Sequence, residues 1–200
     1  MWLALGLAAF VLIGWAIGEA WISAIGSAER EAMETLAEHR TEPWITLARA
    51  ITWAGSASVL VPLGAACCLL LARAGMSRPA WTLALSLAGA IVISDLVKLL
   101  TSRPRPPVEH LQAVTGSSWP SGHATQACAF WLALAFALSG PVSRGVARVC
   151  VLGALLLALG VAWSRVYLGV HYPSDVVAGL VLGGGWAVFV ARVLSARARP

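Results

Sequence analysis

The chain has 200 residues, of which 59% are hydrophobic and 12% are charged, and its mean hydropathy is +0.80. A soluble domain carries charge on about a quarter of its residues, whereas lipid covers most of the outside of a membrane protein. The composition excludes an ordinary soluble domain and indicates one integral membrane domain over residues 1–200. The formal net charge of +5 comes without a basic stripe of interleaved aromatic residues, so we expect no nucleic-acid partner.

The first apolar run covers residues 2–17. No Lys or Arg precedes it, so it lacks the charged start of a signal peptide, and we expect a retained transmembrane helix; cleavage is the alternative. The segment 27–49 that follows is the most polar in the chain. Ser27 can cap a helix that Pro43 would end, which predicts an amphipathic helix on the membrane surface. A solvated connector is the alternative for this segment.

Five further apolar runs cover residues 51–71, 81–100, 123–138, 149–164 and 174–193, each near the roughly 20 residues that span a bilayer core. With the first run they predict an all-α, polytopic membrane protein: a bundle of six transmembrane helices with an interfacial amphipathic helix between the first two. A short basic tail begins at about residue 194. Five tryptophans near run ends suit an interfacial belt: Trp2, Trp21, Trp44, Trp81 and Trp119.

Six spans place both termini on one side of the membrane. The loops and tail on that side carry arginines and no acid: Arg73, Arg78, Arg144, Arg148, Arg192, Arg197 and Arg199. Short loops rich in Lys and Arg remain in the cytoplasm, so we expect a multi-pass cell-membrane protein with both termini cytoplasmic. The opposite ends of the spans, with three polar motifs, should then face the periplasm or exterior.

Metal sites are not expected. All four cysteines lie inside apolar runs and form no C-x-x-C pair, which is typical of small buried hydrophobic residues. The only acids after residue 50 are Asp95, Glu109 and Asp175, too few and too scattered for a magnesium site. We therefore predict no metal and no other cofactor.

The first polar motif closes the run 81–100. Lys98 stands one turn after Asp95, so the two side chains should share one helix face and form an ion pair. An ionisable residue at membrane depth is costly and indicates function, although a snorkelling lysine is the alternative. Pro104 and Pro106 stop the helix and hold Arg105 on an extended path, where its forked guanidinium can bind phosphate oxygens.

The second motif, Pro120-Ser121-Gly122-His123, comes directly before an apolar run. Free N–H groups at a helix N-terminus attract anions, and Gly122 lets a ligand approach the backbone closely. Ser121 can donate a hydrogen bond to an oxyanion; a simple N-cap is the alternative. His123 could protonate a leaving oxygen at this point.

The third motif contains Arg165, His171 and Asp175. Pro173 predicts a helix start, and an acid near that start is a plain alternative for Asp175. Because Asp175 follows His171 by four residues, its carboxylate can instead accept the imidazole N–H. That bond would fix the tautomer and make the other ring nitrogen more basic.

Together the motifs predict one phosphate site just inside a membrane surface. The cations and helix N–H groups would hold three phosphoryl oxygens and replace a metal in neutralising charge. His171 would attack phosphorus to form a phosphohistidine, and His123 would protonate the departing oxygen and then activate water. The predicted catalytic residues are His171, His123 and Asp175, and the predicted phosphate-binding residues are Lys98, Arg105, Ser121, Gly122 and Arg165.

The patterns K-x6-R-P, P-S-G-H and S-R-x5-H-x3-D, at residues 98–106, 120–123 and 164–175, resemble the three signature motifs of the type 2 phosphatidic acid phosphatase superfamily. The resemblance implies a metal-independent, membrane-embedded lipid phosphatase with His171 as nucleophile, Asp175 as orienting acid and His123 as leaving-group acid. Compact bacterial members act on undecaprenyl diphosphate, phosphatidylglycerol phosphate or lipid A. Phosphatidic acid is a further candidate, because the motif residues would bind only the phosphate and do not distinguish between the lipids that carry it. Chain size and site orientation favour undecaprenyl diphosphate.

Two other functions compete with this interpretation. A vanadium-dependent haloperoxidase shares the motifs, because a phosphate pocket also holds vanadate, but six membrane spans argue against it. A non-catalytic lipid-binding or transport protein with a vestigial site is the second alternative. For the phosphatase we expect the lipid bilayer and a membrane lipid phosphate as partners. The sequence does not specify an oligomeric state.

Overall fold

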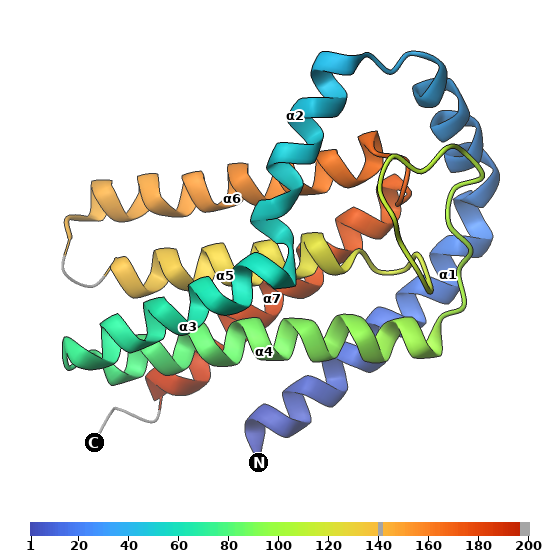
Figure 1. Ribbon diagram of the computed structural model, residues 1–200. Coiled ribbons are helices and arrows are strands. Elements are labelled where there is room, and N and C mark those ends of the chain that lie inside the picture. The colour runs from blue at the N-terminus through green and yellow to red at the C-terminus, as the bar shows by residue number, and fades with distance from the viewer. Residues whose placement is uncertain (140–141, 197–200) are drawn as a thin grey trace.

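The computed structural model describes residues 1–139 and 142–196 of the chain (Figure 1). Arg197 and Arg199 of the predicted basic tail lie outside the described residues. All regular secondary structure in the described part is helical, as predicted: α1 (Trp2–Glu38), α2 (Glu42–Thr52), the 3-10 helix η1 (Trp53–Gly55), α3 (Ala57–Arg73), α4 (Ser77–Leu100), α5 (Gly122–Leu138), α6 (Arg144–Tyr167) and α7 (Pro173–Ala196).

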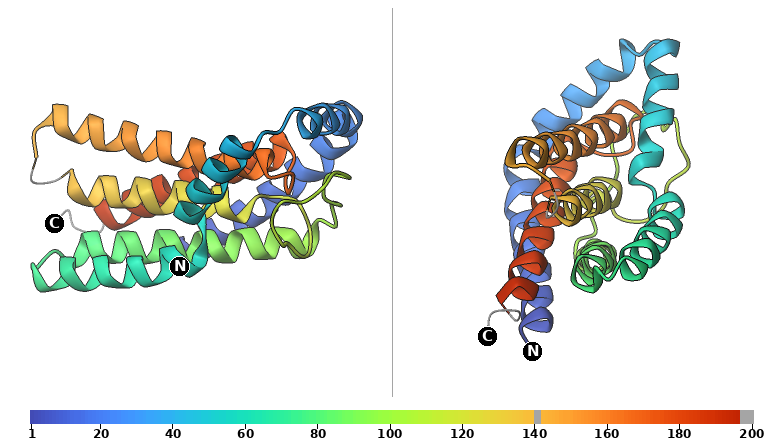
Figure 2. Two further views of the ribbon diagram at one scale, coloured as in Figure 1. Left: turned by 45° about the horizontal axis from the view of Figure 1, so that its top comes forward. Right: turned by 90° about the vertical axis from the view of Figure 1, so that its left-hand side faces the viewer.

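Helix α5 forms the centre of the bundle, with α3, α4, α6 and α7 packed around it (Figure 2). Its sequence is rich in alanine, and most of its residues are buried, Phe130 completely. Small side chains let neighbouring helices approach closely, as is common inside membrane bundles. The N-terminus of α5, which carries the second motif, is therefore enclosed by the ends of the surrounding helices.

Glycines bring α7 against α5. A Cβ atom at Gly183 would lie 2.1 Å from the carbonyl oxygen of Thr125, and one at Gly179 would lie 2.7 Å from that of Ser121. Neither position has room for a side chain. The contact fixes the start of α7, with Asp175, beside the start of α5, with Ser121.

The prediction of a separate helix beginning at Ser27 is wrong. Helix α1 continues without a break through Ser27 to Glu38, and Pro43 lies in the first turn of α2 instead of ending a helix. The first turn tolerates proline because its missing N–H has no helical partner there. Helix α2 turns its apolar face inward: Ile45 and Ala48 pack in one buried cluster with Tyr167, Leu168 and Val170.

The run predicted at 51–71 is also not one straight helix. A 44° bend separates α2 and η1 from α3. The bend brings Gly55 close to the start of α5, where an added Cβ would lie 2.8 Å from the carbonyl oxygen of His123. In the described part, α1, α4, α6 and α7 are long and apolar enough to cross a membrane, and the bent pair would make a fifth such segment. Helix α5 is apolar but shorter, with 17 residues.

Trp119 is wrongly predicted as part of an interfacial belt. Its ring is 1% exposed, and its Nε1–H donates to the carbonyl oxygen of Gly14 at 3.0 Å. Gly18 lies against the same ring, with space for no Cβ atom. Trp119 thus joins the N-terminal helix α1 to the loop that leads into α5.

Candidate active site

The three motifs meet at one end of the bundle, on the side opposite the α3–α4 and α5–α6 connections (Figure 1). Lys98 lies in the last turn of α4, and Arg165 lies in the last turn of α6. Ser121 precedes α5, and Asp175 lies in the first turn of α7. The α4–α5 loop, residues 101–121, and the α6–α7 loop, residues 168–172, close over this end.

His171 and Asp175 form the centre of this region. Nδ1 of His171 lies 3.4 Å from Oδ2 of Asp175, and the two side chains are 3% and 0% exposed. Oδ2 also accepts the hydroxyl of Ser118 at 2.5 Å and the backbone N–H of Tyr172 at 2.8 Å. These donors hold the carboxylate in place. With Nδ1 of His171 facing this carboxylate, Nε2 points away from Asp175. Nη1 of Arg105 lies 3.4 Å from that nitrogen.

Burial lowers the pKa of His171 to about 4, although the hydrogen bond and negative charge of Asp175 oppose this shift. The positive charges of Lys98 and Arg165 lower the pKa further. His171 is therefore a neutral imidazole at neutral pH. A neutral ring nitrogen keeps the lone pair that nucleophilic attack requires.

Arg105 and Lys98 are held by backbone carbonyl oxygens of the α4–α5 and α6–α7 loops. Arg105 donates to the carbonyl oxygens of Val170 at 2.7 Å and Thr115 at 2.8 Å, and Nζ of Lys98 donates to that of Ser117 at 2.8 Å. The predicted ion pair between Lys98 and Asp95 is wrong. No such pair closer than 4.0 Å forms among the described residues, and Asp95 is exposed while Lys98 turns toward the loop.

Arg165 reaches the same region from α6. It is 1% exposed, and Nη1 donates to the hydroxyl of Thr52 at 2.9 Å and to the amide oxygen of Gln112. Each of these partners is neutral. The guanidinium therefore keeps its full positive charge inside the protein, where an anion would be strongly attracted.

The start of α5 offers a free hydroxyl. Ser121 is the N-cap, but its side chain makes no cap bond, and its backbone N–H donates to the carbonyl oxygen of Asp175 at 3.0 Å. Within residues 1–139 and 142–196, the buried Oγ of Ser121 and the Nε atoms of Arg105 and Arg165 have no hydrogen-bond partner. Buried donors without partners are costly and suggest a ligand with oxygen acceptors. The half-buried His123 follows one residue after Gly122.

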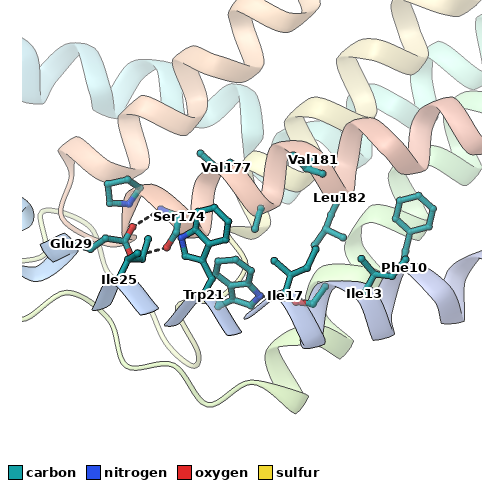
Figure 3. Close-up of a pocket in the computed structure, with 14 residues that line it drawn as sticks. Phe10, Ile13, Ile17, Trp21, Ile25, Glu29, Ser174, Val177, Val181 and Leu182 are labelled. Carbon is teal, nitrogen blue, oxygen red and sulfur yellow. Dashed lines mark hydrogen bonds between the residues drawn. The ribbon is translucent and has the colours of Figure 1, made fainter. Parts of the chain in front are cut away.

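Several polar residues at this end lie outside the predicted site. They include Ser118, which contacts Asp175, and a group formed by Glu29, Arg103 and Ser174. Arg103 donates to Oδ1 of Asp175 at 2.5 Å and to Oε2 of Glu29 at 2.6 Å. Glu29 also accepts the N–H of Ser174 at 2.7 Å and its hydroxyl at 2.8 Å (Figure 3). In the sequence, Glu29 is one of several acids in a polar segment. Its pairing depends on the path of α1, which periodicity alone does not reveal.

Known proteins of similar sequence and structure indicate the family of this chain. The family model of the PAP2 superfamily matches residues 79–199. Phosphatidylglycerophosphatase B of Bacillus subtilis is 31% identical over 169 residues, which cover 80% of each chain. A protein of Escherichia coli K12 provisionally named undecaprenyl-diphosphatase YbjG is 33% identical over 146 residues, which cover 70% of this chain and 69% of the relative. The crystal structure of a transmembrane PAP2-type phosphatidylglycerolphosphate phosphatase from Bacillus subtilis matches with a TM-score of 0.82 at 25% identity, covering 100% of this chain and 98% of that chain.

The family match covers more than half of the chain and includes all three motifs, which confirms the resemblance read from them. The structural match extends the similarity to the N-terminal helices. The chain therefore belongs to the PAP2 superfamily and is a membrane lipid phosphatase, a hydrolase of phosphoric esters.

Proposed function

We propose that this phosphatase hydrolyses the terminal phosphate of undecaprenyl diphosphate through a phosphohistidine on His171. The observation that carries the mechanism is the geometry of His171: Nδ1 is held 3.4 Å from Asp175, while Nε2 is 3.4 Å from Arg105. A neutral, oriented imidazole beside an arginine is suited to attack a bound phosphoryl group. The same arrangement has no evident use in a protein that only binds lipid.

In the first step, Nε2 of His171 attacks phosphorus and the bond from phosphorus to the leaving oxygen breaks. His123 gives its proton to that oxygen. Water then attacks the phosphohistidine with His123 as base, the P–N bond breaks, and inorganic phosphate leaves. Asp175 stabilises the imidazolium character that develops on His171 in both steps.

Phosphate binding in this proposal uses fixed positive charge. Lys98, Arg105 and Arg165 supply three cations, and the partnerless Nε atoms of the two arginines can each donate to a phosphoryl oxygen. The free hydroxyl of Ser121 and the backbone at Gly122 add donors at the start of α5. These groups neutralise the developing charge without a metal ion.

For the membrane arrangement, we propose six spans: the four long apolar helices, the bent pair α2–α3 and the shorter α5. Both termini would lie in the cytoplasm, and the end with His171 would face the periplasm or exterior. The arginines at the opposite end, such as Arg73 and Arg144, support this orientation. The segment from the end of α1 into α2 would then lie at the outer surface of the membrane.

The substrate preference rests on chain size and on this orientation. The name of the Escherichia coli relative agrees with it, whereas the Bacillus subtilis relative and neighbour are named for phosphatidylglycerol phosphate. The latter is therefore the second candidate, followed by phosphatidic acid and lipid A.

A phosphate-release panel on purified protein in detergent micelles tests the proposal. It contains undecaprenyl diphosphate, phosphatidylglycerol phosphate, phosphatidic acid and lipid A, each assayed with excess EDTA and with excess magnesium. We expect the highest kcat/KM for undecaprenyl diphosphate and equal rates with EDTA and magnesium. A preference for another lipid would overturn the substrate, and activity that requires magnesium would overturn the metal-free mechanism.

A further inference from the structure

A buried network of charged side chains, Glu29, Arg103 and Asp175, connects helix α1 to the proposed nucleophile. Asp175, which contacts His171 through Oδ2, binds Nη1 of Arg103 through Oδ1 at 2.5 Å. Nη2 of Arg103 binds Oε2 of Glu29 at 2.6 Å. The side chains of Glu29, Arg103 and Asp175 are 8%, 2% and 0% exposed. Their mutual attraction is therefore screened little by water.

The contacts in this network hold the Arg103 side chain in one position. Its guanidinium lies over the ring of Tyr172, 4.2 Å from the centroid, and Nη1 also donates to the hydroxyl of Ser174 at 2.7 Å. Both carboxylate oxygens of Glu29 are used as well, one by the N–H of Ser174 and the other by Arg103 and the Ser174 hydroxyl. The Glu29 end of this network borders an apolar groove between α1 and α7 (Figure 3).

The charges in this network have opposite effects on His171. Arg103 offsets the negative charge that Asp175 presents to the imidazole. Glu29 in turn offsets the positive charge of Arg103. The three residues together carry one net negative charge. Glu29 therefore restores part of the negative potential at His171 that Arg103 cancels.

We propose that Glu29 and Arg103 are positioning residues that orient Asp175 and set the charge it presents to His171. The proposal rests on the proposed role of His171 as nucleophile. Glu29 lies outside the three sequence motifs, and Arg103 occupies an unspecified position of the first motif. The network also gives the N-terminal helix α1 a part in the reaction centre, which is otherwise built from α4 to α7 and their loops.

Other charged groups also face the two ends of the network. Around His171 these are Asp175 of α7, Lys98 of α4, Arg165 of α6, Arg105 of the α4–α5 loop and His123 of α5. Around Arg103 and Tyr172 they are Glu29 and Arg30 of α1 and Asp175. All of these charges except that of Glu29 remain in place in Glu29→Gln, so a change in the titration of His171 reports the network itself.

The test compares pH profiles of kcat/KM for Glu29→Gln, for the double variant Glu29→Gln/Arg103→Gln and for the control Glu31→Gln. The control removes the same charge from an exposed position of the same helix. In Glu29→Gln the unbalanced Arg103 disfavours protonation of His171, so the acidic limb should move to lower pH by about half a unit or more. In the double variant Arg103 no longer offsets Asp175, so the limb should return to the wild-type position or above it. A single Arg103→Gln variant would leave the Glu29 carboxylate buried without a cation, and the double variant avoids this.

A second measurement needs no turnover. NMR of protein with 13C-labelled histidine, with the His171 signal assigned through His171→Gln, follows the titration of His171 directly in the same variants. If the wild type proves inactive, the proposed function fails while this titration still tests the network. Glu31→Gln should match wild type in both readouts.

The proposal is overturned if folded Glu29→Gln titrates like Glu31→Gln, or if Glu29→Gln and the double variant shift in the same direction. Size-exclusion chromatography and thermal melting establish folding. If Glu29→Gln does not fold, Arg103→Lys replaces it, because lysine keeps the charge but cannot bridge both carboxylates in the same forked way. That variant should lower kcat at least tenfold with an unmoved acidic limb, and an unchanged kcat would equally overturn the proposal.

Discussion

Oδ2 of Asp175 lies 3.4 Å from Nδ1 of His171 while it also accepts the Ser118 hydroxyl at 2.5 Å. Replacing Asp175 with asparagine keeps the size of the side chain but removes the charge and presents an amide to these donors. We expect kcat to fall about 10²- to 10⁴-fold, because the imidazole loses both its fixed tautomer and the charge that stabilises it. Phosphate release by folded protein measures the effect. The control Asp95→Asn, at an exposed site on α4, should retain full activity.

His123 is expected to act on the leaving oxygen. His123→Ala should therefore lower kcat about 10²- to 10⁴-fold for an alkyl phosphate, whose leaving alkoxide needs a proton. A p-nitrophenyl ester needs little protonation, so phosphoenzyme formation from it should be much less affected. Rapid-quench measurement of the nitrophenol burst separates the two cases. Equal losses for both esters would show that His123 does not serve as the leaving-group acid.

The pKa of His171 predicts the acidic limb of the activity profile. Burial lowers this pKa to about 4, so the ring stays neutral and nucleophilic between about pH 4 and 6.5, where an exposed histidine would already be protonated. In the free enzyme, kcat/KM should decline because of His171 only as the pH approaches 4 from above. A short-chain phosphate ester of known ionisation permits correction for the substrate. A His171 limb at pH 6.5 or higher would contradict the buried, neutral imidazole.

The orientation of the protein can be tested with single cysteines in a background lacking the four natural ones. Ala113→Cys lies at an exposed position of the α4–α5 loop, and Ala74→Cys lies at an exposed position of the α3–α4 turn. A membrane-impermeant thiol reagent should label the first in intact cells and the second only after permeabilisation. The reverse pattern would invert the proposed topology.

The sequence was most informative where a residue's type and its local spacing decide its position. His171 and Asp175, four residues apart across a helix start, are in contact as their spacing predicted. The last four apolar runs also form helices, α4 to α7, with small shifts at their ends, because burial in an apolar bundle needs the same pattern as a span in lipid.

Predictions failed where a long-range contact decides the outcome. Lys98 binds the carbonyl oxygen of Ser117 instead of Asp95, because the loop that follows α4 folds back over the end of the helix. Glu29 and Arg103 are joined across 74 positions of the chain, so no local spacing predicts that they form a pair. The residue type of Trp119 predicts a place at the interface, yet Gly18 of α1 makes space for its ring inside the protein.

The central claim is that His171 carries the phosphoryl group during turnover, and trapping that group tests it most directly. Protein quenched at the millisecond scale after mixing with [32P]-labelled undecaprenyl diphosphate should carry a label that is lost in acid and stable in base, as expected for a phosphoramidate. Mass spectrometry should assign the phosphate to His171, and His171→Ala should carry none and show no turnover. A label on another residue, or robust turnover by His171→Ala, would contradict the mechanism.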